Sequence, residues 1–217
     1  MLLFKEDLYL MVVLMKNRKW FILGLSALFI ILTILVKFDL TTGFDNYFYK
    51  IITLHMNNTL TNIFKVITFL GSTGFIIALC AIFLIVFIII KHKNKGFIVT
   101  SVLIISTVIN NGIKLIIQRE RPDVIKLVTE HSFSFPSGHT MASVSMYGIL
   151  MYLVIRSNLN NKLKIVLSTI LGIIPILVAI SRVYLGAHYI TDVIGGIIMS
   201  TILLLVATYY IDKKKWI

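Results

Sequence analysis

Residues 181–211 read SRVYLGAHYITDVIGGIIMSTILLLVATYYI, a short polar segment followed by a long apolar run. The polar segment contains Arg182, His188 and Asp192, and the apolar run covers residues 189–211. A helix needs about 20 predominantly apolar residues to cross a bilayer, so this run predicts a membrane span. Ionisable residues at the end of such a span indicate a functional site by default.

Five further apolar runs precede this one, and they cover residues 20–36, 75–90, 97–117, 140–155 and 165–180. Before the second of them, residues 60–72 are also apolar, but Gly71 and its neighbours interrupt the pattern. This segment predicts an interfacial helix and a turn. We therefore expect an all-α membrane protein, a six-transmembrane-helix bundle with a short interfacial helix before the second span.

The composition agrees with a membrane protein. The chain is 58% hydrophobic and 14% charged, with a mean hydropathy of +0.95. In soluble domains roughly half of the residues are apolar and about a quarter are charged. The length of 217 residues, without repeats, predicts one membrane-embedded domain over residues 1–217. The single Cys80 allows no intrachain disulfide.

The net charge is +12, and the Lys and Arg residues that produce it are divided unequally between the two sets of helix ends. Twelve Lys and Arg residues cluster at one set of helix ends, and eight lie at the opposite ends. Short cytoplasmic loops are enriched in Lys and Arg, so we expect cytoplasmic termini and motifs on the outer side of the cell membrane. A nucleic-acid site would need a basic stripe on a soluble face, so no nucleic-acid partner is expected.

The first polar motif is Lys114 followed, after six residues, by Arg121-Pro122. A spacing of seven is two helical turns, which predicts that Lys114 and Arg121 project from one helical face. Pro122 is expected to end this helix. Two cations at a helix end suit the oxygens of a phosphate. Arg119 falls on another face and is interpreted as a lipid-headgroup contact.

The second motif is Pro136-Ser137-Gly138-His139, at the start of the fourth span. Ser137 is a good N-cap residue, and the free N–H groups at a helix N-terminus favour an anion. His139 would stand in the first turn, beside a bound phosphate. No carboxylate close in the sequence is evident as an acidic partner for His139.

In the third motif, His188 and Asp192 are one helical turn apart. The carboxylate can therefore accept a hydrogen bond from one ring nitrogen and leave the other free to attack, as in a serine-protease triad. Arg182 offers a planar fork for a phosphate. The five histidines also raise the alternative of a zinc site, but the surrounding cations would repel a metal ion. We therefore expect neither a metal nor a cofactor.

The three motifs together resemble the signature of the type 2 phosphatidic acid phosphatase superfamily, with no position departing from its pattern. The resemblance covers a core of about residues 60–210. The segments 130–135 and 183–186 are similar to the Gram-positive bacterial phosphatidylglycerophosphatase B type. In that family a six-helix bundle holds the site near the outer membrane surface.

The resemblance also implies a role for each motif residue. His188 would attack phosphorus and form a phosphohistidine, His139 would protonate the leaving oxygen, and Asp192 would orient His188. Water would then cleave the intermediate. The phosphoryl oxygens would be bound by Lys114, Arg121, Ser137, the N–H of Gly138, and Arg182.

Several functions remain open at this point. A haloperoxidase would hold vanadate in the same oxyanion cage, but known haloperoxidases resemble soluble proteins. A transporter or a lipid-binding protein would not need a nucleophile, an acid and three phosphate-binding cations. Within the enzyme class, the substrate is expected to be a membrane phospholipid or a polyprenyl phosphate. Phosphatidylglycerophosphate is preferred; the alternatives are undecaprenyl pyrophosphate and phosphatidic acid with broad specificity. Oligomeric state is not predicted.

Overall fold

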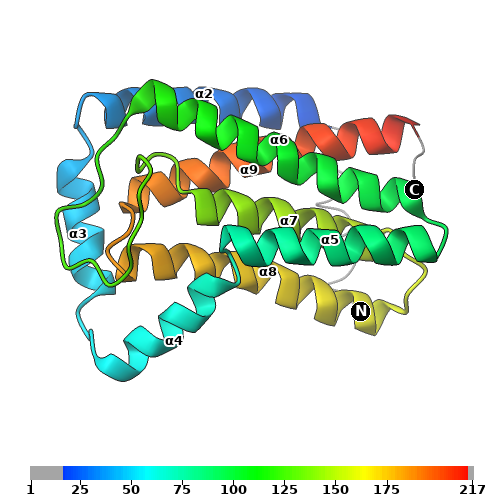
Figure 1. Ribbon diagram of the computed structural model, residues 1–217. Coiled ribbons are helices and arrows are strands. Elements are labelled where there is room, and N and C mark those ends of the chain that lie inside the picture. Colours follow the sequence, from blue (N-terminus) through cyan, green and yellow to red (C-terminus); the bar gives the residue numbers. More distant parts are fainter. Residues whose placement is uncertain (1–16, 215–217) are drawn as a thin grey trace.

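The computed structural model describes residues 17–214, which form eight α-helices and no strand (Figure 1). The helices are α2 (Arg18–Lys37), α3 (Thr42–Ile52), α4 (Asn58–Phe69), α5 (Thr73–Ile89), α6 (Lys93–Ile117), α7 (Gly138–Ile155), α8 (Asn161–Tyr184) and α9 (Ile190–Lys214). Each of the six predicted spans corresponds to one helix, namely α2, α5, α6, α7, α8 or α9, so the all-α membrane architecture is confirmed. Two residues of the predicted basic clusters, Lys16 and Lys215, lie outside the described residues.

Within the described residues, five helices are long and apolar enough to cross a membrane: α2, α6, α7, α8 and α9. The sixth span depends on α4 and α5, which meet at a bend of 42°. Large apolar side chains on the outer surface, such as Ile30, Ile116 and Ile176, are more than half exposed. Apolar surface of this extent on a helical bundle is stable in contact with lipid rather than water.

The predicted interfacial segment forms α4 and the turn that follows it. Asn57 caps α4 by accepting a hydrogen bond from Leu60 N at 2.9 Å. In the turn, a Cβ on Gly71 would contact Val178 of α8 at 2.5 Å, so this close approach requires glycine. Helix α3 was not predicted, because its 11 residues are too few and too polar to read as a span.

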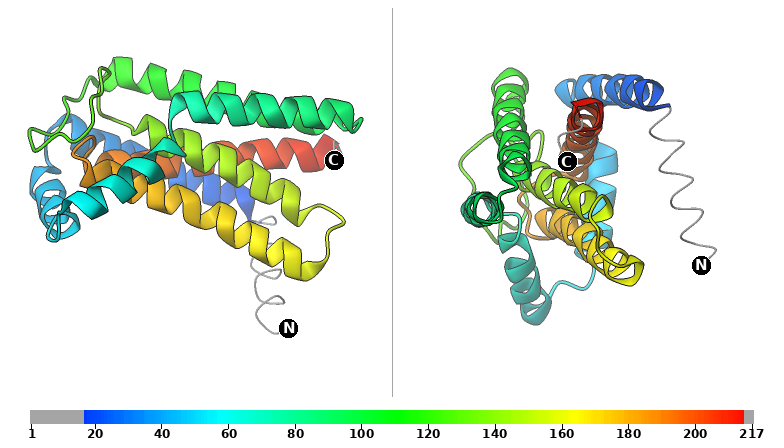
Figure 2. Two further views of the ribbon diagram at one scale, coloured as in Figure 1. Left: turned by 60° about the horizontal axis from the view of Figure 1, so that its bottom comes forward. Right: turned by 90° about the vertical axis from the view of Figure 1, so that its right-hand side faces the viewer.

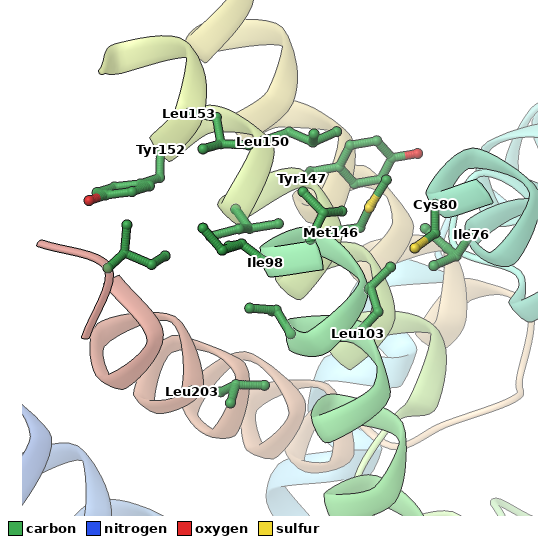
Figure 3. Close-up of a cluster of buried hydrophobic side chains, with 14 residues drawn as sticks. Ile76, Cys80, Ile98, Leu103, Met146, Tyr147, Leu150, Tyr152, Leu153 and Leu203 are labelled. Atoms are coloured by element: carbon green, nitrogen blue, oxygen red, sulfur yellow. The ribbon is translucent and has the colours of Figure 1, made fainter. Parts of the chain in front are cut away.

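Helix α7 lies at the centre of the bundle, between α6, α8 and α9 (Figures 1 and 2). Its buried side chains, including Met146 and Ile149, belong to an apolar cluster shared with α5, α6 and α9 (Figure 3). Ser145 donates a hydrogen bond to Ser106 of α6 at 2.9 Å. Small and hydroxyl-bearing residues at helix contacts allow close packing in a membrane, where no hydrophobic force draws helices together.

The two ends of the bundle differ in chemistry. At one end lie the last turn of α9 and the α5–α6 and α7–α8 connections, and at the other lie α3, the long 118–137 connection and the 185–189 turn (Figures 1 and 2). At the first end, Asp212 pairs with Arg18 at 3.0 Å and with Arg156 at 2.6 Å. All three sequence motifs lie at the second end.

Candidate active site

The first motif is assembled differently from the prediction. Helix α6 ends at Ile117, and Gln118 adopts a left-handed conformation with φ of 52°. Arg121 therefore lies in the connection rather than on a helical face shared with Lys114, and Pro122 does not end the helix. Both cations nevertheless converge on Ser132: Lys114 Nζ donates to its Oγ at 3.0 Å, and Arg121 Nε donates to its carbonyl oxygen at 2.7 Å.

The third motif brings a histidine and a carboxylate together. His188 is 2% exposed and lies in the turn between α8 and α9, while Asp192 is in the first turn of α9. His188 Nδ1 is 3.4 Å from Asp192 Oδ2, and Nε2 is 3.3 Å from an Arg121 nitrogen. The carboxylate thus faces one ring nitrogen, and the Arg121 guanidinium faces the other.

The surroundings of His188 keep its ring neutral. Burial, with a smaller contribution from the Arg182 and Arg121 charges, lowers the pKa of His188 to about 4, against the opposing effect of Asp192. A neutral imidazole at pH 7 has a free lone pair on the nitrogen that does not donate to Asp192. The geometry therefore suits His188 Nε2 as a nucleophile.

A serine that the sequence analysis missed stands between the members of this pair. Ser134 Oγ is 2.5 Å from Asp192 Oδ2 and 3.3 Å from His188 Nδ1. Tyr189 N donates to the same carboxylate oxygen at 2.9 Å. Ser134 shares the sequence segment that precedes Pro136, but nothing in its spacing identifies it as a partner of Asp192.

Arg119 is a correction to the sequence analysis. It is 9% exposed, and its guanidinium donates to Asp192 at 2.6 Å and to Asp45 of α3 at 2.7 Å. The expected headgroup contact is therefore wrong. Arg119 was placed by helical periodicity, but the helix has already ended at Ile117, so the helical face no longer applies.

The second motif forms the N-terminus of α7, as predicted. Ser137 caps the helix by accepting from Thr140 N at 3.4 Å and from Thr140 Oγ1 at 2.9 Å. Its side chain is fully buried and faces Thr140. Gly138 and His139, by contrast, line the cavity described below.

A second missed residue, Glu130, contacts the cations of the site. Its carboxylate accepts a hydrogen bond from Arg182 and lies 3.8 Å from both Arg121 and His139 Nδ1. Burial acts to raise its pKa, but the charges of Arg182, His139 and Arg121 hold the pKa of Glu130 below its usual value. Glu130 is therefore an acidic neighbour of His139, which the sequence analysis did not identify.

Arg182 lies at the C-terminal end of α8 and is 1% exposed. Besides Glu130, it donates to Thr68 Oγ1 at 2.8 Å. Its buried Nε has no hydrogen-bond partner within residues 17–214. A buried guanidinium with spare donors is suited to hold an anion.

The turn that carries His188 requires glycine. Gly186 has a φ of +68°, which L side chains rarely adopt, and a Cβ there would run into the carbonyl oxygen of Ile125. Leu127 N donates to Leu185 O at 3.1 Å in the same region. The turn therefore packs directly against the 118–137 connection, which carries Arg121 and Glu130.

Part of this site lines a cavity of about 640 Å³. Its apolar wall comes from α5, α6 and α7 and includes Ile76, Leu103 and Ala142. Its polar lining consists in part of Lys114, Arg121, Glu130, Ser132, Gly138, His139 and His188. An apolar cavity with a few converging polar groups is the usual form of a ligand site.

Comparison with known proteins identifies the family of the chain. The sequence model of the PAP2 superfamily matches residues 95–216. The chain belongs to the PAP2 superfamily. The match extends over α6 to α9, the helices that carry the three motifs, and so confirms the resemblance inferred from them.

One PAP2 relative covers most of the chain. Phosphatidylglycerophosphatase B of Bacillus subtilis is 32% identical over 193 residues, which are 88% of this chain and 95% of the relative. The crystal structure of a transmembrane PAP2 type phosphatidylglycerolphosphate phosphatase from Bacillus subtilis superposes with a TM-score of 0.82, covering 88% of this chain and 96% of that one. The identity in that comparison is again 32%.

A more distant neighbour shares the fold. The crystal structure of Aquifex aeolicus LpxE superposes with a TM-score of 0.62 at 24% identity, covering 75% of this chain and 93% of that one. Within the described part of this PAP2 protein, no cluster of three or more His, Cys, Asp or Glu residues could hold a metal ion.

Proposed function

We propose that this PAP2 membrane protein hydrolyses the phosphomonoester of a membrane lipid, with phosphatidylglycerophosphate as the preferred substrate. The observation that carries the proposal is the position of His188 Nε2, which lies 3.3 Å from Arg121 and lines the same cavity as Lys114 and His139. The apolar wall of that cavity fits acyl chains, and its polar part fits a phosphate. The phosphatidylglycerophosphatase activity of the Bacillus subtilis relative supports this lipid over undecaprenyl pyrophosphate or phosphatidic acid.

The reaction proceeds in two displacements. In the first, His188 Nε2 forms a bond to phosphorus, the bond from phosphorus to the lipid oxygen breaks, and His139 gives its proton to that oxygen. In the second, His139 takes a proton from water, the oxygen of that water attacks phosphorus, and the phosphorus–nitrogen bond breaks. Inorganic phosphate leaves, and both histidines return to their starting states.

The remaining residues stabilise charge and orientation. Lys114, Arg121, Arg182 and the N–H of Gly138 hold the phosphoryl oxygens, which carry the spread charge of a loose transition state. Asp192 accepts from His188 Nδ1 and so directs the Nε2 lone pair at phosphorus. Ser137 contributes by capping α7, which aims the N-terminus of that helix at the site.

A panel of purified lipid phosphates tests the proposed function. Wild-type protein in detergent should release inorganic phosphate from phosphatidylglycerophosphate faster than from phosphatidic acid or undecaprenyl pyrophosphate. Because the site is built from cations, release should persist in excess EDTA. Absence of release from every lipid phosphate would refute the function, and loss on chelation that one divalent ion restores would refute the cation-based mechanism.

We further propose that the termini are cytoplasmic and that the active-site end faces outward, because Lys and Arg are more numerous at the opposite end. The test uses single cysteines at Asn94 and Thr129, both exposed, in a background where Cys80 is replaced by alanine. An impermeant thiol reagent on intact cells should label the cysteine at position 129 and spare the one at position 94. The reverse pattern would place the active site inside the cell.

Glu130 supplies a prediction about anion binding. Its carboxylate contacts the cations that the mechanism assigns to phosphate, so a bound dianion and Glu130 repel one another. We expect Glu130→Gln to tighten inhibition by orthovanadate by about tenfold, because one nearby negative charge is removed. The measurement is the vanadate inhibition constant at pH 7.

The control for this prediction is Glu120→Gln, which removes an exposed carboxylate from the same connection. It should leave vanadate inhibition unchanged. Weaker inhibition of the Glu130→Gln variant would show instead that the carboxylate supports the anion site, through its neighbour His139.

A further inference from the structure

Asp192 is held on both of its oxygens. Oδ2 faces His188 and accepts from Tyr189 N and Ser134 Oγ. Oδ1 accepts from Arg119 at 2.6 Å. The orientation of this carboxylate is therefore set by a cation from the first motif's six-residue spacer, which is not itself a motif position.

Arg119 is itself fixed from several directions. Its second terminal nitrogen donates to Asp45 Oδ2 at 2.7 Å and to Thr41 Oγ1 at 3.0 Å. Its guanidinium lies 3.9 Å from the centre of the Tyr189 ring. A planar group with two nitrogens bound and its face covered has one available orientation.

Asp45 connects the network to α9. Its Oδ1 accepts from Thr191 N at 3.0 Å, and the Thr191 hydroxyl lies 2.8 Å from the same oxygen. Thr41 Oγ1 donates to Oδ2 at 2.9 Å. Asp45 thus joins α3 to the residue directly before Asp192.

Burying the charges of this network has a free-energy cost that a purely structural contact between helices would not need. The side chains of Asp45 and Asp192 are fully buried, and that of Arg119 is 7% exposed. Removing three charges from water carries a large desolvation cost for each ion, so a buried ion pair is weak support for stability alone. The Arg18–Asp212 pair at the other end is more open, since the Asp212 side chain is 20% exposed.

We propose that Arg119 and Asp45 are positioning residues, in which Arg119 holds Oδ1 of Asp192 so that Oδ2 faces His188, and Asp45 fixes Arg119 against α3. This inference rests on the proposed function, because it assigns Asp192 the orientation of a nucleophilic histidine. Neither residue touches the substrate. Both act through Asp192.

The charge of Arg119 also reaches His188 through Asp192. The titratable groups around His188 are Asp192 from α9, Arg182 from α8, His139 from α7, and Arg121 and Glu130 from the 118–137 connection. Without Arg119, the negative charge of Asp192 acts on His188 in full and raises its pKa. Without the Asp45 charge, Arg119 neutralises Asp192 more completely and lowers the pKa of His188.

The experiment compares Arg119→Gln, Asp45→Asn and the double variant in full-length purified protein, using the lipid phosphate that wild type cleaves fastest. We expect kcat to fall about 10–100-fold in Arg119→Gln and about tenfold in Asp45→Asn, with KM little changed, as for other partners that orient a ligand or base. The double variant should be no slower than Arg119→Gln, because Asp45 acts through Arg119. The acid limb of kcat/KM should move to higher pH in Arg119→Gln and to lower pH in Asp45→Asn.

Arg18→Gln is the matched control, since it removes a buried arginine from an Arg–Asp pair far from the site. It should lower the thermal midpoint and leave kcat and the pH profile unchanged. The inference is overturned if Arg119→Gln and Asp45→Asn behave like this control, or if their defects in kcat simply multiply.

Two further outcomes are also decisive. If Arg119→Gln does not accumulate as folded protein, the near-isosteric Asp45→Asn decides, and an unshifted acid limb overturns the inference. An inactive wild type on every lipid phosphate overturns the proposed function and the inference with it. An active wild type with unaffected variants overturns the inference alone.

Discussion

Replacing His188 by alanine is expected to abolish phosphate release, with a loss of about 10⁴–10⁶-fold, as for the loss of a nucleophile elsewhere. Nε2 is the nucleophilic atom in the proposed mechanism, and His139, which lines the same cavity, is assigned to proton transfer. The measurement is kcat on the preferred lipid phosphate and on nitrophenyl phosphate. Both substrates should be equally affected, because an activated leaving group does not replace a missing nucleophile.

The role of His188 also predicts how wild-type activity changes on the acid side of its pH profile. Burial and the neighbouring arginines lower the pKa of His188 to about 4, so the ring stays neutral as pH falls below 6.5 and loses its lone pair only near pH 4. Activity attributable to His188 should therefore persist at pH 5. The matched control is His92→Ala, which changes an exposed histidine at the other end of the bundle and should have no effect. Substantial activity of His188→Ala would contradict the assignment.

Replacing His139 by alanine is expected to produce a defect that depends on the leaving group. A general acid contributes about 10²–10⁴-fold, so release from a lipid phosphate should fall by this amount. A nitrophenolate leaves with little need for a proton, so the defect on nitrophenyl phosphate should be much smaller. The measurement is the ratio of the two rates in variant and wild type.

The same substrate pair distinguishes the two histidines. If the activated substrate restores activity to His188→Ala and not to His139→Ala, the roles are reversed. If the His139→Ala defect is equal on both substrates, His139 does not protonate the leaving group. His139, which lies 3.8 Å from Glu130, would then help to bind the phosphate rather than transfer a proton.

The membrane fold could be predicted because bilayer thickness imposes a length on each apolar run. Residues 97–117 and 189–211 were predicted as spans, and the corresponding helices are Lys93–Ile117 and Ile190–Lys214. Helix α3 could not be predicted in this way. Its Asp45 is fully buried because of partners in the 118–137 connection and α9, more than 70 residues away in the chain.

The motif positions could be located from the sequence because they sit at the ends of spans. The geometry of the motif residues relative to one another could not be predicted from the sequence. The periodicity argument treated Lys114, Arg119 and Arg121 as points on one helix, but the left-handed Gln118 redirects the chain after Ile117. A left-handed conformation at glutamine has no signature in the sequence, so the environment of Arg119 was wrongly predicted.

Ser134 and Glu130 were missed for a related reason. Both lie in a connection whose path depends on contacts with α6, α8 and the 185–189 turn rather than on local propensity. Ser134 contacts Asp192 across 58 positions of the chain, and Glu130 contacts Arg182 across 52. Such contacts follow from the folded bundle and leave no pattern in the nearby residues.

The phosphohistidine is the central claim of this account, and trapping it is the most direct test. Purified wild-type protein is mixed with lipid phosphate carrying a radioactive phosphoryl group, quenched at alkaline pH within the first turnover, and digested. We predict one labelled peptide that contains His188, with acid-labile label that is absent from His188→Ala. Label on another residue, or complete turnover with no labelled protein at any quench time, would contradict it.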